Sequence, residues 1–177
     1  MSTLRVVRSI RSNLLTRAFL ALFSIAVLAA CGPLATGDST RFAYERNATY
    51  PVLAGQSLFV ELEIELEELG LDIEKVTRLA TSWIPAGLRG ESANATNFLF
   101  FEDVEVAEGW QARLWQARVV RERPFNDPEG DLTYRIDITV RVDVPEEAYD
   151  LTRRVSGAFV ARDGSGSVPI TFLVEAF

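Results

Sequence analysis

The clearest pattern in this chain of 177 residues is a strict alternation of apolar and polar positions. From Ser57 to Leu66, every second residue is Leu, Val or Ile, and Glu61, Glu63 and Glu65 fill positions between them. The same period of two runs from Leu132 to Val144. An extended chain points successive side chains to opposite faces, so this period predicts strands buried on one face.

Further segments continue the β pattern. Trp110 to Arg123 is predicted to be a third long strand, joined in a hairpin to the strand at 132–144 by turn-forming residues at 124–131. Residues 155–162 and 168–176 form a second predicted hairpin. Weaker alternation predicts strands at 42–49 and 97–106.

Residues 67–84 carry conflicting signals. Ile73, Val76, Ala80 and Trp83 have helical spacing, but no clear cap precedes them and several β-branched residues favour a strand. We expect a strand from Lys75 to Ile84, which leaves no predicted helix.

About seven to nine strands without a helix predict an all-β fold with two packed sheets. The run Ala54-Gly55-Gln56-Ser57 before an alternating strand is similar to the opening of bacterial immunoglobulin-like domains, as is Val144-Pro145-Glu146-Glu147-Ala148-Tyr149 after one. The resemblance implies an immunoglobulin-like β-sandwich over residues 41–177, although the Cys-Trp-Cys framework of antibody domains is absent. The second and fifth strands of such sandwiches are often neighbours, so we expect Glu61, Glu63 and Glu65 to face Arg135 and Arg141.

The first 30 residues have a different composition. Four arginines and no acidic residue occur there, and 18–30 is an apolar run of 13 residues, whereas a membrane-spanning helix takes about 20. The run ends in Leu28-Ala29-Ala30-Cys31, which resembles the lipobox of bacterial lipoproteins. The resemblance implies a signal peptide at 1–30, lipidation of Cys31 with acyl chains such as palmitate, and a short lipidated tether at 31–40. It also implies a membrane-anchored protein of the cell envelope facing the periplasm or the exterior, and Gly32 favours the outer membrane.

Charge and composition narrow the function. All 25 acidic residues and 14 of the 18 basic ones follow residue 30, so this part carries 14 − 25 = −11. Such an acidic chain repels phosphate backbones, and no nucleic-acid partner is expected. Histidine is absent and Cys31 is the single cysteine. The usual general base and the usual zinc ligands are therefore missing, so we expect neither enzymatic activity nor a cofactor.

Two groups of carboxylates have an ordinary and a functional interpretation. Asn126, Asp127, Glu129 and Asp131 offer oxygen ligands that suit Ca²⁺, but their spacing is not that of an EF-hand, and a solvated turn whose Asp and Asn side chains bind local backbone amides is the favoured interpretation. The glutamates at 61, 63, 65, 67 and 68 could pair for glycoside hydrolysis, although alternate residues on an outward face are usually only solvated.

The tryptophans supply the remaining candidate site. Trp110 and Trp115 are five residues apart, so a regular strand would place them on opposite faces and only one could enter the core. The other is a possible ligand or partner patch. The leading expectation is a non-enzymatic protein-interaction or structural role at the envelope. A carbohydrate- or peptidoglycan-binding module is the alternative.

Overall fold

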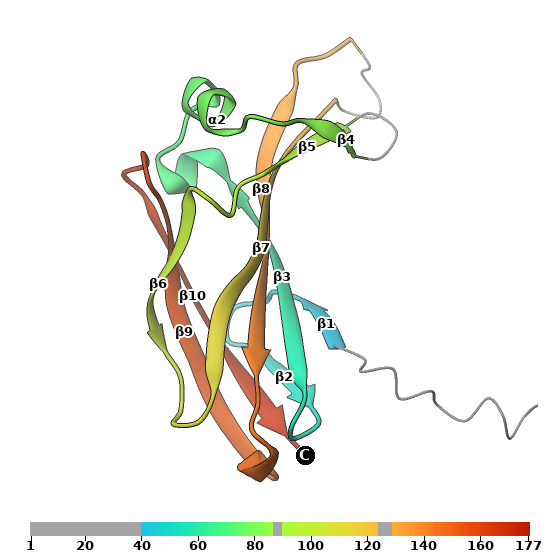
Figure 1. The fold of residues 1–177 in the computed structure, drawn as a ribbon, viewed down its shortest axis with the longest axis vertical. Coiled ribbons are helices and arrows are strands. Elements are labelled where there is room, and N and C mark those ends of the chain that lie inside the picture. Colours follow the sequence, from blue (N-terminus) through green and yellow to red (C-terminus); the bar gives the residue numbers. More distant parts are fainter. Residues whose placement is uncertain (1–39, 87–89, 124–128) are drawn as a thin grey trace, which may run out of the picture. The chain divides into compact units, whose positions relative to one another are not determined.

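The computed structural model describes residues 40–86, 90–123 and 129–177. Within these ranges ten strands form two packed sheets (Figure 1), so the predicted all-β sandwich is confirmed, with ten strands instead of seven to nine. The described residues belong to one compact unit. The predicted signal peptide, Cys31 and the tether up to residue 39 lie outside the described residues.

One sheet has six strands, in the order β1 (Thr40–Ala43), β3 (Ser57–Glu65), β8 (Thr133–Asp143), β7 (Gln111–Glu122), β5 (Gly90–Asn94) and β4 (Ile84–Ala86). The other has four, in the order β2 (Thr49–Val52), β10 (Ser167–Ala176), β9 (Leu151–Ala161) and β6 (Leu99–Glu105). Constant-type immunoglobulin sandwiches group strands A, B, E and D against C, F and G, and here β1-β3-β8-β7 and β6-β9-β10 have the same grouping. The arrangement departs from that pattern where β1 runs parallel to β3 and where β4 and β5 extend the sheet beyond β7.

The core lies between the sheets and consists of the apolar members of the alternating pattern. β3, β7 and β8 each begin and end within one residue of the predicted segments, and both predicted hairpins pair antiparallel. Leu58, Val140, Phe159 and Phe172 are among the large side chains that are fully buried. Removing these side chains from water is the main free-energy gain that holds the two sheets together.

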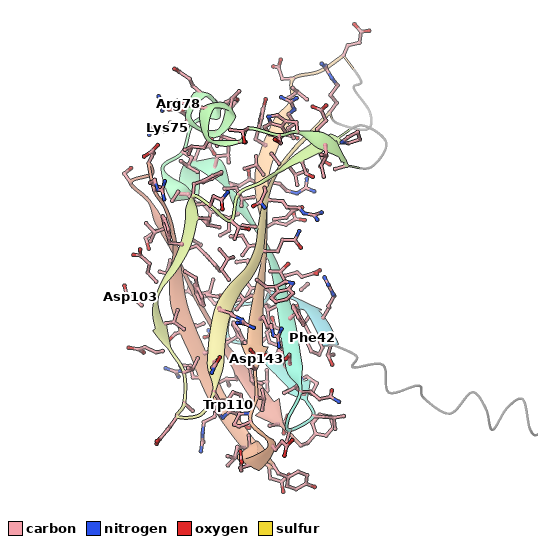
Figure 2. The ribbon with its side chains drawn as sticks, in the orientation of Figure 1. Phe42, Lys75, Arg78, Asp103, Trp110 and Asp143 are labelled. Carbon is pink, nitrogen blue, oxygen red and sulfur yellow. The ribbon has the colours of Figure 1, made fainter. Side chains whose placement is uncertain are left out.

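The prediction of a strand at 75–84 is wrong. The chain instead forms a short 3₁₀ helix, η1 (Leu66–Leu69), and a helix, α2 (Ile73–Leu79), whose Lys75 and Arg78 are marked in Figure 2. The missed signal is Asp72, whose carboxylate accepts a hydrogen bond from the Lys75 N–H at 2.7 Å and caps the helix. Val76, fully buried, anchors the helix to the core, so tertiary packing outweighs the strand preference of the β-branched residues.

The prediction of one strand at 42–49 is also wrong. β1 ends at Ala43 and β2 begins at Thr49 in the other sheet, with a turn between them in which Asn47 has a φ of 61°. The Tyr50 hydroxyl holds this turn: it accepts the Glu45 N–H at 2.6 Å and donates to the Ala43 carbonyl at 2.9 Å. Burial raises the pKa of Tyr50. The chain therefore crosses from one sheet to the other within a segment that the sequence pattern predicted to be one strand.

A second short 3₁₀ helix, η2 (Glu146–Ala148), connects β8 to β9.

Candidate binding face

The two tryptophans have different surroundings. Trp110, immediately before β7, is 6% exposed and belongs to the core, so it is not available as part of a surface patch. Trp115, within β7, is 47% exposed on the outer face of the six-stranded sheet. The prediction that only one of the pair enters the core is therefore confirmed, and Trp115 is the one that solvent reaches.

A β-bulge fixes the position of Trp115. Leu114 lies opposite Val140 and Gln116 lies opposite Thr139, the next residue along β8, so Trp115 is the extra residue of the pair. A bulge puts two adjacent side chains on nearly the same face of the sheet. Gln116 consequently joins Trp115 on the outer face, and Ala117 after the bulge returns to the core. The alternation of apolar and polar residues in the sequence did not predict where this bulge lies.

Arginines and a phenylalanine surround the Trp115 ring. The ring meets Phe59 of β3 edge to face, with centroids 5.6 Å apart. The guanidinium carbons of Arg141 and Arg113 lie 5.1 Å and 5.9 Å from the Trp115 centroid. Arg41 lies 5.5 Å from the Phe59 centroid, and Phe59 is only 6% exposed although it is on the outer face. We call these five residues the Trp115 cluster, an exposed aromatic ring held in place by cation-π and ring contacts.

Asp143 at the end of β8 anchors the arginines of the cluster; Figure 2 marks its place. Its carboxylate accepts hydrogen bonds from the Ser57 hydroxyl at 2.5 Å and from Arg141 Nε at 2.6 Å, and Arg113 lies 3.5 Å away. Burial alone would raise the pKa of Asp143, but these hydrogen bonds and charges outweigh it and lower the pKa overall. An ionised Asp143 therefore positions Arg141 beside the Trp115 ring.

A groove of about 530 Å³ lies next to the cluster on the outer face of the sheet. Gln116, which follows Trp115 in the bulge, is one of its lining residues. Its polar lining comes from four strands and the turn after β1: Arg41, Tyr44, Glu61, Glu63, Gln116, Arg118, Asp137 and Thr139. We call this space the groove.

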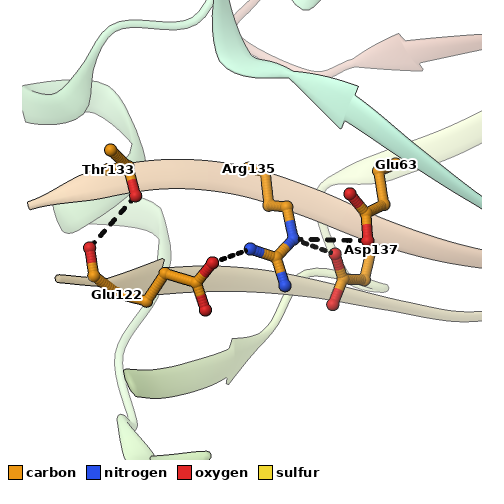
Figure 3. Close-up of polar contacts among 5 residues, drawn as sticks. All are labelled: Glu63, Glu122, Thr133, Arg135 and Asp137. Atoms are coloured by element: carbon orange, nitrogen blue, oxygen red, sulfur yellow. Dashed lines mark hydrogen bonds and ion pairs between the residues drawn. The ribbon is translucent and has the colours of Figure 1, made fainter. Parts of the chain in front are cut away.

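Ion pairs order the charged side chains of the groove. Arg41 and Glu61 form a salt bridge of 2.5 Å. Arg135 lies between carboxylates, with Nε 2.8 Å from Asp137 and 3.6 Å from Glu63, and its Nη1 also binds Glu122 (Figure 3). Burial would lower the pKa of Arg135, but the hydrogen bonds that Arg135 donates to Glu122 and Asp137 raise it overall, so it stays a cation.

The predicted pairing of the second and fifth strands is confirmed, because β3 and β8 are antiparallel neighbours. The charge contacts agree with the prediction only in part. Arg135 reaches Glu63, whereas Arg141 lies opposite Phe59 and binds Asp143 instead of a glutamate. Sequence reasoning missed Arg41 and Gln116, because their roles depend on the parallel β1–β3 pair and on the bulge.

The remaining candidates do not assemble into a second site. Asn126 and Asp127 of the possible Ca²⁺ loop lie outside the described residues, whereas Glu129 and Asp131 are described. Across residues 40–86, 90–123 and 129–177, no three His, Cys, Asp or Glu side chains gather as a metal site would require. In the same part of the chain, no helix is both long and apolar enough to cross a membrane.

Comparison with known proteins adds little to this description. No protein-family model matches the chain, and no curated protein matches it. Among solved structures, the solution structure of amebosin is similar over 80% of this chain and 100% of its own, with a TM-score of 0.39 and 8% sequence identity. A similarity this low supports no conclusion about function.

Proposed function

We propose that this protein is a non-enzymatic binding domain, held at the bacterial cell envelope by lipid on Cys31, that binds another envelope component through the outer face of its six-stranded sheet. The observation that carries the proposal is Trp115, which is 47% exposed, fixed in place by a bulge and followed directly by Gln116, a lining residue of the groove. Large aromatic side chains with arginine neighbours are typical of binding hot spots.

The anchor is supported by the basic and apolar segments before Leu28-Ala29-Ala30-Cys31. Two or three acyl chains on Cys31 would bind a bilayer stably, since each buried methylene contributes about 0.8 kcal/mol. Metabolic labelling with an alkyne analogue of palmitate tests it. The wild-type chain should take up the label and Cys31→Ser should not; equal labelling of both would reject the anchor.

Binding fits the groove better than catalysis does, although carboxylates converge there. Glycoside hydrolysis needs one protonated carboxylic acid, which enzymes obtain by burying it away from cations. The side chains of Glu61, Glu63 and Asp137 are 47%, 71% and 39% exposed, and each has an arginine partner. These carboxylates are therefore open to solvent and next to cations, which is the opposite of the enclosed apolar setting of such an acid.

The proposed function is tested by affinity capture from detergent-solubilised envelopes with the full chain as bait. Wild-type protein should retain an envelope component that Trp115→Ala loses. Phe100→Ala is the matched control, because Phe100 is 37% exposed beside Arg162 on the outer face of the other sheet. Equal capture by wild type and Trp115→Ala would contradict the proposed face.

A further inference from the structure

We infer that the groove beside Trp115 binds a neutral saccharide. The inference rests on the proposed function and names the chemistry of its ligand. Three properties of the groove favour such a ligand: its mixture of hydrogen-bonding groups, its charge and its aromatic neighbour.

The groove presents donors and acceptors side by side. Glu61, Glu63 and Asp137 offer carboxylate oxygens, whereas Arg41 and Arg118 offer guanidinium N–H groups, and Gln116 and Thr139 can do both. A sugar hydroxyl is at once a donor and an acceptor, so a run of hydroxyls can bond alternately to carboxylates and guanidiniums. Hydrogen bonds to charged partners are roughly twice as strong as those between neutral groups.

The charge of the lining argues for a neutral ligand. Glu61, Glu63 and Asp137 contribute −3 and Arg41 and Arg118 contribute +2, so the lining carries −3 + 2 = −1. Arg113, Arg141 and Asp143 beside Trp115 add 2 − 1 = +1, so the site as a whole carries no net charge. The chain after residue 30 carries a formal charge of −11, from 14 basic and 25 acidic residues. A phosphate, a uronic acid or a nucleic acid would approach against this field. A polyol without charge would not.

Trp115 does not line the groove, but it precedes the lining residue Gln116 on the same face of the sheet and offers an apolar surface at the border of the groove. Sugar rings carry hydrogens of C–H bonds on their faces, and an exposed indole can cover such a face and remove it from water. The bulge is what unites the two chemistries, because it sends Trp115 and Gln116 to the same side of the sheet. The groove's volume of about 530 Å³ is within the usual range of small-ligand sites, roughly 300 to 1,000 Å³.

The same lining is less suited to a protein partner. Cores of protein interfaces are depleted of charged residues, and a protein lying on this face would bury the Arg41–Glu61 and Arg135–Asp137 pairs. Removing ion pairs from water is strongly unfavourable unless the partner replaces every lost hydrogen bond. A saccharide offers hydroxyls in place of water molecules, and each hydroxyl can both donate to a carboxylate and accept from a guanidinium.

The test uses the full chain in a detergent without a sugar headgroup, titrated with a tetramer of glucose and with a tetramer of N-acetylglucosamine. Calorimetry gives the affinity and tryptophan fluorescence reports contact with the indole. Trp115→Ala should weaken binding at least about tenfold, and Gln116→Ala about threefold, whereas Phe100→Ala should stay within about twofold of wild type. Thermal unfolding of each variant checks that it is folded.

Two outcomes would overturn the inference: neither tetrasaccharide binds, or Trp115→Ala binds as tightly as wild type. Tighter binding of a sulfated tetrasaccharide than of the neutral ones would overturn the assignment to a neutral ligand. Failure here is separable from failure of the proposed function. If envelope capture depends on Trp115 but no saccharide binds, the domain binds a protein and only this inference falls.

Discussion

Each outer face of the sandwich has an exposed aromatic ring next to arginine, yet the two surroundings differ. Trp115 lies on β7 in the interior of the six-stranded sheet, with Arg141 5.1 Å from its centroid and the groove beside it. Phe100 lies on β6 at the edge of the four-stranded sheet, with Arg162 5.6 Å away. Its cross-strand partner is Val160, which offers no hydrogen-bonding side chain. An exposed aromatic ring therefore suggests a site only where its neighbours supply complementary chemistry.

The two sheets also use their bulges differently. The bulge in β7 lies in its pairing with β8 and presents Trp115 and Gln116 to solvent. The irregularity in β6 lies on an edge strand between Glu102 and Glu105, where Asp103 has a φ of 51° (Figure 2 marks Asp103). Carboxylates and a bulge on an edge discourage further strands from pairing there. The same backbone device thus presents side chains in one sheet and blocks an edge in the other.

The largest expected effect lies in the core that both faces share. Phe159 is fully buried and stacks on Phe101 with centroids 4.8 Å apart. Phe159→Ala should lower the free energy of unfolding by about 3 to 5 kcal/mol, measured by urea denaturation, because it removes the ring and leaves a cavity. Phe100→Ala on the outer face should change it by about 1 kcal/mol or less. A loss from Phe159→Ala no greater than that of Phe100→Ala would contradict this assignment of the core.

A smaller loss is expected at Gly157 in the four-stranded sheet. A Cβ added there would overlap the ring of Phe101, which lies across the glycine. Gly157→Ala should therefore displace Phe101 and lower the free energy of unfolding by about 1 to 3 kcal/mol, measured by thermal or urea unfolding. Saccharide affinity should be unchanged, because Gly157 belongs to the other sheet. A change in affinity without a loss of stability would show that the two faces are coupled.

Arg135 should have a more modest effect, and it acts on the six-stranded sheet. It contacts Glu63, Glu122 and Asp137, so Arg135→Gln leaves three carboxylates without their shared cation. The free energy of unfolding should fall by about 1 kcal/mol at low salt and by less at high salt, because ions screen partly exposed charges. Arg154→Gln, on an exposed position of β9, is the control and should show little change. A loss that does not depend on salt would indicate packing instead of charge.

Most of the fold could be predicted from the sequence because burial on one face leaves a period of two. β3, β7 and β8 follow it closely. Prediction failed where a local interaction set the structure: the Asp72 cap began a helix, and the turn at Asn47 divided one expected strand between two sheets. Such local hydrogen bonds leave little trace in an average over hydrophobicity.

The candidate site was predictable only as a choice between Trp110 and Trp115. Its surroundings depend on contacts between residues far apart in the sequence, such as Arg41 with Glu61 and Phe59 with Trp115. The bulge that unites Trp115 with Gln116 is a matter of register between β7 and β8. No periodicity within one strand encodes the register of its neighbour.

The smallest expected effect is a pH dependence at Asp143, the residue that anchors Arg141 in the Trp115 cluster. Its pKa is lowered in the folded protein, since the hydrogen bonds from Ser57 and Arg141 outweigh the opposing effect of burial. A carboxylate with a lowered pKa adds stability above its unfolded pKa of about 3.9 and loses it as the pH falls through the folded value. Asp143→Asn should therefore lower the free energy of unfolding at pH 7 by roughly half a kcal/mol, as expected for a partly exposed ion pair.

That difference between wild type and Asp143→Asn should shrink when unfolding is measured in acid, below the folded pKa of Asp143, because the wild-type side chain is then neutral as well. Ser57→Ala removes the hydroxyl donor at 2.5 Å and should reduce the pH dependence without abolishing it, since Arg141 remains. A difference that stays constant from neutral to acidic pH would mean that Asp143 acts through its shape and not its charge. The position of the Trp115 ring would then depend on its packing against Phe59 and not on the charge of Asp143. The surroundings of Trp115 and Phe100 would still differ in the groove that lies beside Trp115.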